Sequence, residues 1–168
     1  MKRVVIIGSP GSGKSTFAAA LSKKTGLPVI HLDYYYHQKD KNYQSDSKAW
    51  RKKVGELIKN DKWIMDGNYA SSYDLRLPAA KTIILFNFPR YIAMWQVIKR
   101  RVKYHNKPRS DMPDTWKEKA DWEFIRYVWG FKKKYDSDIR SILESYKDKE
   151  VFIFNSKGEA KIFLARIT

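Results

Sequence analysis

Short hydrophobic segments alternate with longer amphipathic segments along this chain. The hydrophobic segments are rich in β-branched and aromatic residues, and they are short enough to be buried strands rather than helices. We predict strands at residues 3–7, 28–32, 63–65, 82–88 and 151–154. Strands separated by helices are typical of a parallel sheet that helices cover on both faces, so the pattern predicts an α/β fold.

The segments between these strands carry apolar residues at the three- and four-residue spacing of a helix. We predict helices at residues 16–24, 47–59, 91–103, 116–146 and 159–167, with a short irregular or helical stretch at 70–80. Gly26 is expected to cap the first helix, and Gly130 to break or kink the longest one. A length of 168 residues suits one domain, residues 1–168, with a sizeable core.

The segment between the first strand and the first helix reads Gly-Ser-Pro-Gly-Ser-Gly-Lys-Ser and matches the phosphate-binding pattern G-x-x-x-x-G-K-[ST]. In that setting, successive backbone N–H groups form a nest for phosphate at the helix N-terminus. The pattern predicts that Lys14 bridges the β- and γ-phosphates, Ser15 ligates Mg²⁺ and Thr16 reaches the α-phosphate. A glycine-rich turn without a ligand is the alternative, which the strand and helix on either side disfavour. The candidate nucleotide-binding residues here are Gly8, Pro10, Gly11, Ser12, Gly13, Lys14, Ser15 and Thr16.

Two aspartates follow predicted strands at the end where an open α/β sheet faces its ligand. Asp33 follows the strand at 28–32 and precedes three tyrosines, which either line an acceptor pocket or pack against the next segment. Asp66 follows the strand at 63–65 and is predicted to hold Mg²⁺ through water. The alternative for Asp66 is a turn-forming pair with Gly67.

The chain has 34 lysine and arginine residues against 18 aspartate and glutamate residues, a formal net charge of +16. Such a field implies anionic partners, either the phosphates of a nucleotide-binding kinase or the backbone of a nucleic acid. Scattered surface lysines are a third explanation. Basic residues concentrate at 99–109, and the following aperiodic stretch with two prolines is typical of a functional lid loop.

Several classes are disfavoured by what the chain lacks. It contains no cysteine, which excludes a disulfide framework and a thiolate metal site. No apolar run approaches the length of a membrane span, and the first strand begins too early to leave room for a signal peptide. We therefore expect a cytoplasmic protein without a membrane partner.

Four stretches of the chain together resemble one branch of the P-loop kinases. They are GSPGSGKST at 8–16, HLD at 31–33, WIMDGNY and DLRL within 63–77, and FPR and KRRVKY within 88–104. In order and spacing they are similar to adenylate-kinase-like P-loop kinases, and within that branch to the bacterial topology modulation proteins. The resemblance implies a three-layer P-loop NTPase fold with a five-stranded sheet in the order 2-3-1-4-5. It also implies an acceptor site between strands 2 and 3 and a short helical lid near 104–118.

The resemblance also assigns roles to individual residues. Asp33 resembles the aspartate that holds the acceptor hydroxyl in shikimate- and gluconate-type kinases, and Asp66 resembles the aspartate that orders Mg²⁺ in adenylate kinases. Arg100 and Arg101 resemble paired arginines at the entry to the lid. Arg126 resembles a phosphate-contacting arginine on the helix that leaves it.

One position departs from the adenylate kinase pattern. In those kinases the Asp-Gly pair is followed by Pro-Arg, and this arginine grips the monophosphate acceptor. Here Asn68-Tyr69 stands in that place. Arg76, further along, is the candidate replacement, and a nucleoside monophosphate acceptor is correspondingly less expected.

The sequence thus predicts Mg²⁺-dependent transfer of the γ-phosphoryl group from ATP to a small acceptor, which is a nucleotide, a nucleoside or another hydroxyl compound. The candidate catalytic residues are Lys14, Asp33, Arg100 and Arg101. One alternative is a nucleotide-regulated DNA-binding protein of the topology modulation kind, with backbone-driven contacts through its basic surface. Another is an NTPase without an acceptor.

Overall fold

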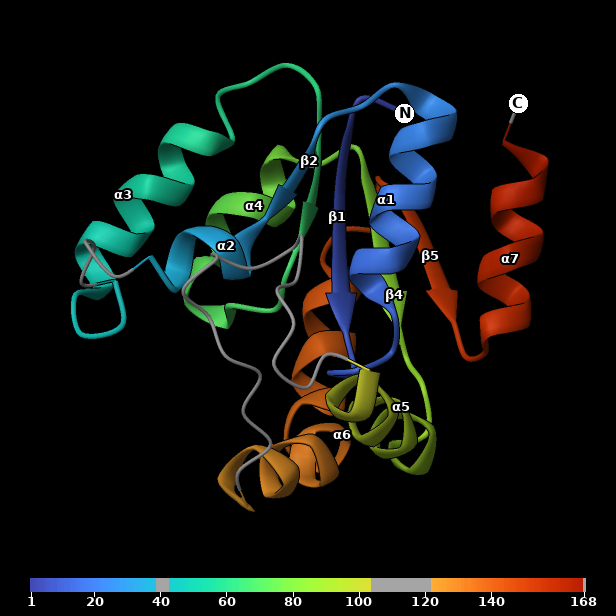
Figure 1. Ribbon diagram of the computed structural model, residues 1–168. Helices are drawn as coiled ribbons and strands as arrows, with labels where there is room; N and C mark the ends of the chain where they lie inside the picture. The colour runs from blue at the N-terminus through green and yellow to red at the C-terminus, as the bar shows by residue number, and fades with distance from the viewer. Residues whose placement is uncertain (39–42, 104–121, 168) are drawn as a thin grey trace.

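The computed structural model describes residues 1–38, 43–103 and 122–167 (Figure 1). The predicted lid near residues 104–118 lies outside the described residues. In chain order the described elements are β1 (Arg3–Gly8), α1 (Lys14–Thr25), β2 (Val29–His31), α2 (Leu32–Tyr36), α3 (Ser47–Leu57), β3 (Trp63–Asp66), the 3₁₀ turn η1 (Ala70–Ser72), α4 (Tyr73–Ala79), β4 (Thr82–Phe86), α5 (Arg90–Lys103), α6 (Trp122–Glu144), β5 (Glu150–Phe154) and α7 (Lys157–Arg166).

The strands form one five-stranded parallel sheet in the order β2-β3-β1-β4-β5, which confirms the expected fold and strand order. The register of three neighbouring strands places Asp66 opposite Ile6 of β1 on one side and His31 of β2 on the other. Because all strands are parallel, their carboxyl ends meet at one edge. The end of β3 therefore lies beside the start of the glycine-rich loop.

The core is divided between the two faces of the sheet, since successive residues of a strand point to opposite sides. Val4 and Ile6 pack in the cluster that holds Phe17 and Leu21 of α1, whereas Val5 and Ile7 pack in the cluster of α3, α4 and α6. Figure 1 shows α1 and α7 on one side of the sheet and α3 and α4 on the other. The result is the three-layer arrangement that the sequence predicts.

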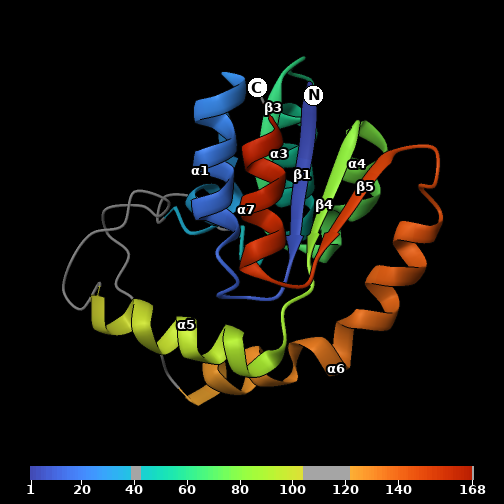
Figure 2. The same ribbon diagram turned by 90° about the vertical axis from the view of Figure 1, so that its right-hand side faces the viewer.

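Helix α5 and the first part of α6 lie across the carboxyl-terminal edge of the sheet (Figure 2). They meet through Ala93, Val97 and Val128, which are buried together. The helical spacing that predicted α5 rests on Ile92, Trp95, Ile98 and Val102. Of these, Ile92 packs against the core, whereas Trp95 is 67% exposed and Val102 is 76% exposed. Ala93 and Val97 therefore mark the packed face of α5 better than its largest apolar residues do.

Two local predictions change in the structure, and one is confirmed. Strand β2 is shorter than expected because β3 ends opposite His31, so the chain turns into α2 and Asp33 lies in the first turn of that helix. Helix α6 continues through Gly130, so the predicted break is absent, although the helix bends along its length (Figure 2). Gly26 caps α1 as predicted, with φ 69° and its N–H donating to the Ser22 carbonyl at 2.8 Å. Within the described ranges, no helix is long and apolar enough to cross a bilayer.

Candidate active site

The glycine-rich loop connects the end of β1 to the start of α1, as the sequence predicts. Gly11 and Gly13 have φ angles of 72° and 93°, a region that favours glycine. The Lys14 ammonium donates to the carbonyls of Gly8 at 3.0 Å and Ser9 at 2.9 Å. The lysine thus folds back over the start of the loop.

Gly11 has a second constraint, because α5 lies directly against it. A Cβ atom at Gly11 would come within 2.8 Å of the Ala93 carbonyl oxygen and 2.7 Å of a Val97 methyl group. We expect Gly11→Ala to lower the free energy of unfolding by about 2 kcal/mol, from backbone strain and overpacking, and to weaken nucleotide binding.

Urea unfolding and affinity for a non-hydrolysable ATP analogue measure both effects. The matched control is Gly55→Ala, because Gly55 lies in α3 with no atom within 4 Å of an added Cβ. That variant should gain about 1 kcal/mol from helix propensity. Wild-type stability in Gly11→Ala would contradict the packing of α5 on this loop.

The two predicted aspartates lie on the same edge of the sheet. Asp66 is the last residue of β3 and is buried, and its Oδ2 atom lies 3.2 Å from Nδ1 of His31. Asp33 is partly buried in α2, and its Oδ1 accepts a hydrogen bond from the Tyr69 hydroxyl at 2.6 Å. Each carboxylate is therefore held by an aromatic side chain from a neighbouring element, which fixes its orientation.

Electrostatics connect these groups to Lys14. Burial lowers the pKa of the Lys14 ammonium, while the charges of Asp66 and Asp33 oppose that shift and the charge of Arg100 adds to it. Charge–charge interactions that shift a pKa act mainly between groups that are close together. The structure thus brings together four residues that the sequence identified separately: Lys14, Asp33, Asp66 and Arg100.

The other predicted site residues are located mainly by the helices that carry them. Ser15 and Thr16 stand in the first turn of α1, where the phosphate pattern puts them. Arg101 lies in α5, but its side chain is outside the described part. Arg126 is exposed on α6.

The donor set can be compared with the needs of a magnesium ion. Mg²⁺ prefers oxygen ligands and is commonly bound by one or two carboxylates together with substrate phosphates and water. The Ser15 hydroxyl and the Asp66 carboxylate are oxygen donors of this type, so the residues present fit the metal. Among the described residues, no group of three or more His, Cys, Asp or Glu side chains gathers as a metal site.

The loop after β3 contributes residues whose roles the sequence did not reveal. Asn68 forms two hydrogen bonds with the Gly8 backbone, at 2.9 Å each: its Oδ1 accepts from the N–H and its Nδ2 donates to the carbonyl. Tyr127 of α6 also hydrogen-bonds to the Asn68 side chain, and burial raises the pKa of that phenol to about 12. The available signal was a pair of polar residues, Asn68 and Tyr69, directly after the Asp-Gly pair that ends a buried strand.

Arg76 was the candidate residue for binding an acceptor phosphate, but the structure does not support that role. Its side chain is fully buried and its guanidinium donates to Ser72 Oγ and to the carbonyls of Gly67, Asn68 and Tyr69. Burial lowers its pKa to about 10, so it stays charged at neutral pH. A guanidinium committed in this way supports the loop from inside and is not presented to a ligand.

Aromatic rings stand beside Asp33. The ring of Tyr69 lies 4.6 Å from that of Tyr36 and 5.0 Å from that of Trp50, and the ring of Tyr43 lies 5.6 Å from that of Trp50. Tyr36 is thus part of a packed cluster, whereas Tyr34 is 43% exposed. Tyr35 and Tyr36 therefore have the packing role that the sequence left open, and a pocket-lining role for Tyr34 stays a prediction.

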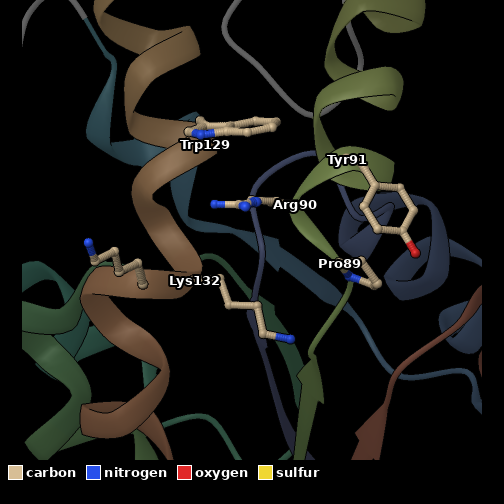
Figure 3. A pocket seen from close by; sticks show the side chains of 6 residues that line it. Pro89, Arg90, Tyr91, Trp129 and Lys132 are labelled. Carbon is tan, nitrogen blue, oxygen red and sulfur yellow. The ribbon is translucent and has the colours of Figure 1, made fainter.

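A separate hollow of about 460 Å³ opens between the start of α5 and α6 (Figure 3). The Arg90 guanidinium lies over the Trp129 ring, 4.6 Å from its centroid. The lining residues are Pro89, Arg90, Tyr91, Trp129, Lys132 and Lys133. Its mixture of aromatic faces and cations is suited to a planar anionic group.

No protein-family model matches the chain. It is 30% identical to a putative adenylate kinase of Sulfurisphaera tokodaii over 107 residues, which cover 58% of this chain and 54% of the relative. The chain spans about half the length of the curated relatives it matches.

Solved structures extend the likeness to nearly the whole chain. Shikimate kinase from Acinetobacter baumannii, in complex with shikimate, superposes with a TM-score of 0.62 at 14% identity, covering 99% of this chain and 90% of that one. Deoxyadenosine kinase from M. mycoides with bound dATP gives 0.59 at 16% identity, covering 99% and 98%. The chain therefore has the three-layer α/β fold of the P-loop kinases, and over part of its length its sequence is similar to adenylate kinases.

Proposed function

We propose that this protein is a P-loop phosphotransferase that binds ATP with Mg²⁺ and transfers the γ-phosphoryl group to a small acceptor. The observation that carries the proposal is the meeting of Lys14 with Asp33, Asp66 and Arg100 at the carboxyl-terminal edge of the sheet. In this proposal the group supplies a donor lysine, a metal-binding acid and an acid for the acceptor. The kinase fold and the adenylate kinase similarity support the same reaction class.

The roles follow from the chemistry of phosphoryl transfer. Its transition state is loose, so catalysis consists of positioning and charge neutralisation. The loop amides and Lys14 hold the donor phosphates, and Arg100 with Arg101 neutralises charge on the transferring group. Ser15 and Asp66 would hold Mg²⁺, which would supply neutralisation of the negative charge on the phosphates. Arg126 is proposed as a further phosphate contact.

Asp33 determines which acceptor the site suits best. A carboxylate repels a phosphate but accepts a hydrogen bond from a hydroxyl and can take its proton. Arg76, the candidate phosphate grip, is committed to the protein's own backbone. We therefore expect a hydroxyl-bearing acceptor, such as a nucleoside or a sugar acid, rather than a nucleoside monophosphate. We expect the reaction to take place in the cytoplasm.

The test is transfer from γ-labelled ATP with Mg²⁺ across nucleosides, nucleoside monophosphates, small sugar acids and short DNA ends. One hydroxyl compound should give a labelled product. Asp33→Asn should lower its rate of formation about a hundredfold, the size typical of lost general-base catalysis, without changing the affinity for an ATP analogue.

Asp61→Asn is the control, because that carboxylate is 96% exposed in its ion pair with Arg3. It should transfer at the wild-type rate. Slow, acceptor-independent release of phosphate as the sole reaction would overturn the kinase proposal. It would then favour an NTPase or the alternative prediction, a nucleotide-regulated DNA-binding protein.

A further inference from the structure

The loop Gly67–Tyr69 has an unusual backbone. Gly67 has a φ of 139°, and Tyr69 has a φ of 29°, the one positive value among the described residues other than glycine. A side chain in this region costs free energy, so the conformation persists only where the surroundings enforce it. The contacts that hold this loop therefore indicate its function.

Arg76 holds the loop from within the protein. Its guanidinium donates to the carbonyls of all three loop residues, and its Nε donates to Ser72 Oγ at 3.1 Å. The Ser72 hydroxyl in turn donates to the Tyr69 carbonyl at 2.9 Å. The planar Arg76 guanidinium, whose donors have fixed directions, thus sets the direction in which the side chains of Asn68 and Tyr69 point.

The Asn68 side chain points to the part of the site that is proposed to bind the phosphate donor, ATP. Its amide closes a two-bond ring with the Gly8 peptide, and the Gly8 carbonyl is also the oxygen that Lys14 contacts. Gly8 and Asn68 lie 60 positions apart in the sequence. The contact therefore ties the first peptide of the phosphate-binding loop to the end of another strand.

Tyr69 points to the acceptor side. Its hydroxyl donates to Asp33 Oδ1 at 2.6 Å, and its ring packs against both Tyr36 and Trp50. Burial and the neighbouring Asp33 charge raise the pKa of Tyr69, so the phenol keeps the proton that it donates. Its hydrogen bond leaves Asp33 oriented by a group that does not titrate at physiological pH.

We propose that Asn68 and Tyr69, together with the Arg76 guanidinium that binds their carbonyls, form one positioning unit. This unit couples the phosphate-binding loop to Asp33. The proposal rests on the proposed function for the role of Asp33. Neither side chain is a reacting group. Asn68 positions the loop that binds the donor, Tyr69 positions the carboxylate that meets the acceptor, and their adjacency in the chain keeps the two at a set separation.

The donor half is tested by affinity for a non-hydrolysable ATP analogue with Mg²⁺, a readout that needs no acceptor. Asn68→Ala should weaken binding about tenfold, as expected when two hydrogen bonds that fix a binding loop are lost. Arg76→Gln should weaken binding of the analogue by a similar factor, even though the Arg76 side chain is fully buried. In the double variant the loss should stay near that of the worse single variant, because both changes disrupt one unit.

The acceptor half is tested by the kinetics of Tyr69→Phe. This variant should keep its affinity for the ATP analogue within about twofold and lower kcat/KM for the acceptor about tenfold, since one charge-assisted hydrogen bond is lost. A residue that only stabilised the fold would lower the melting temperature and leave both constants unchanged.

Thr82→Val is the matched control. It removes the partly buried 2.8 Å hydrogen bond from the buried Thr82 to Glu150, at the end of β4 that lies away from the site. It should lower stability and leave both constants unchanged. If Arg76→Gln does not fold, Ser72→Ala removes one anchor of the guanidinium and should weaken analogue binding about threefold.

Unchanged affinity in Asn68→Ala, or additive losses in the double variant, would overturn the positioning unit. Failure of the wild-type protein to phosphorylate any acceptor would instead refute the proposed function, while the affinity measurements would still decide the donor half.

Discussion

Replacing Lys14 with alanine is expected to lower phosphoryl transfer from ATP about a thousandfold, the loss seen when a preorganised donor to developing charge is removed. The ammonium already lies over the loop, 3.0 Å from the Gly8 carbonyl and 2.9 Å from the Ser9 carbonyl. A phosphate in the nest would offer it a far stronger acceptor than a neutral carbonyl. The measurement is the rate of labelled product formation with saturating ATP.

Lys23→Ala provides the control, because Lys23 is exposed in the last turn of the same helix. It removes an equal charge far from the nest and should leave the transfer rate within about twofold of wild type. Transfer by Lys14→Ala within tenfold of wild type would contradict the assignment of Lys14 to the donor phosphates.

The pH dependence of ATP binding gives a second readout of Lys14. Burial lowers the pKa of this ammonium in the nucleotide-free protein. Phosphate charges favour the protonated form, so binding raises the pKa and takes up a proton where the free lysine has lost it. Affinity should therefore fall as the pH rises through the lowered pKa. Calorimetry in two buffers of different ionisation enthalpy should show proton uptake that Lys14→Ala abolishes.

Arg76→Met is expected to cause the largest loss of stability, about 4 kcal/mol. The substitution relieves the cost of burying a charge, but it leaves the carbonyls of Gly67 and Asn68 without the donor that Arg76 supplies, in a buried to partly buried site. The Tyr69 carbonyl keeps its hydrogen bonds from Ser72. Each buried polar group left unpaired costs about 1–3 kcal/mol, so the loss outweighs the gain. Such a change is a large fraction of the stability of a typical domain, about 5–15 kcal/mol.

Urea unfolding followed by tryptophan fluorescence measures this loss, and the melting temperature should fall by about 8–16 °C. Arg51→Met is the comparison, because Arg51 forms an exposed ion pair with Asp74 at 2.7 Å and should contribute little. Equal stability of Arg76→Met and wild type would show that the loop keeps its conformation without the guanidinium.

Much of the fold follows from local pattern. Alternation of apolar and amphipathic segments predicted the strands and helices, and the loop pattern predicted which residues would surround a phosphate. These features depend on short-range periodicity and on the steric freedom of glycine, which act within a few residues. For the same reason Gly26 could be assigned as a helix cap before its φ was known.

Other features depended on which surfaces meet. The large apolar residues of α5 suggested its packed face, yet Trp95 and Val102 are exposed and Ala93 is buried against the loop at Gly11. Asp33 was expected beyond a strand and lies in a helix, because the length of β2 is set by where its neighbour β3 ends. Neither outcome is encoded in the periodicity of the segment concerned.

By itself the sequence determined the class of this protein: an α/β fold, with a phosphate-binding loop and acids at the ends of neighbouring strands. Only the tertiary structure decided that Arg76 faces inward, that Asn68 closes on Gly8 and that Tyr69 holds Asp33. The physical reason is the register of the parallel sheet. It brings the ends of β1, β2 and β3 together and so creates contacts between residues that are far apart in the chain.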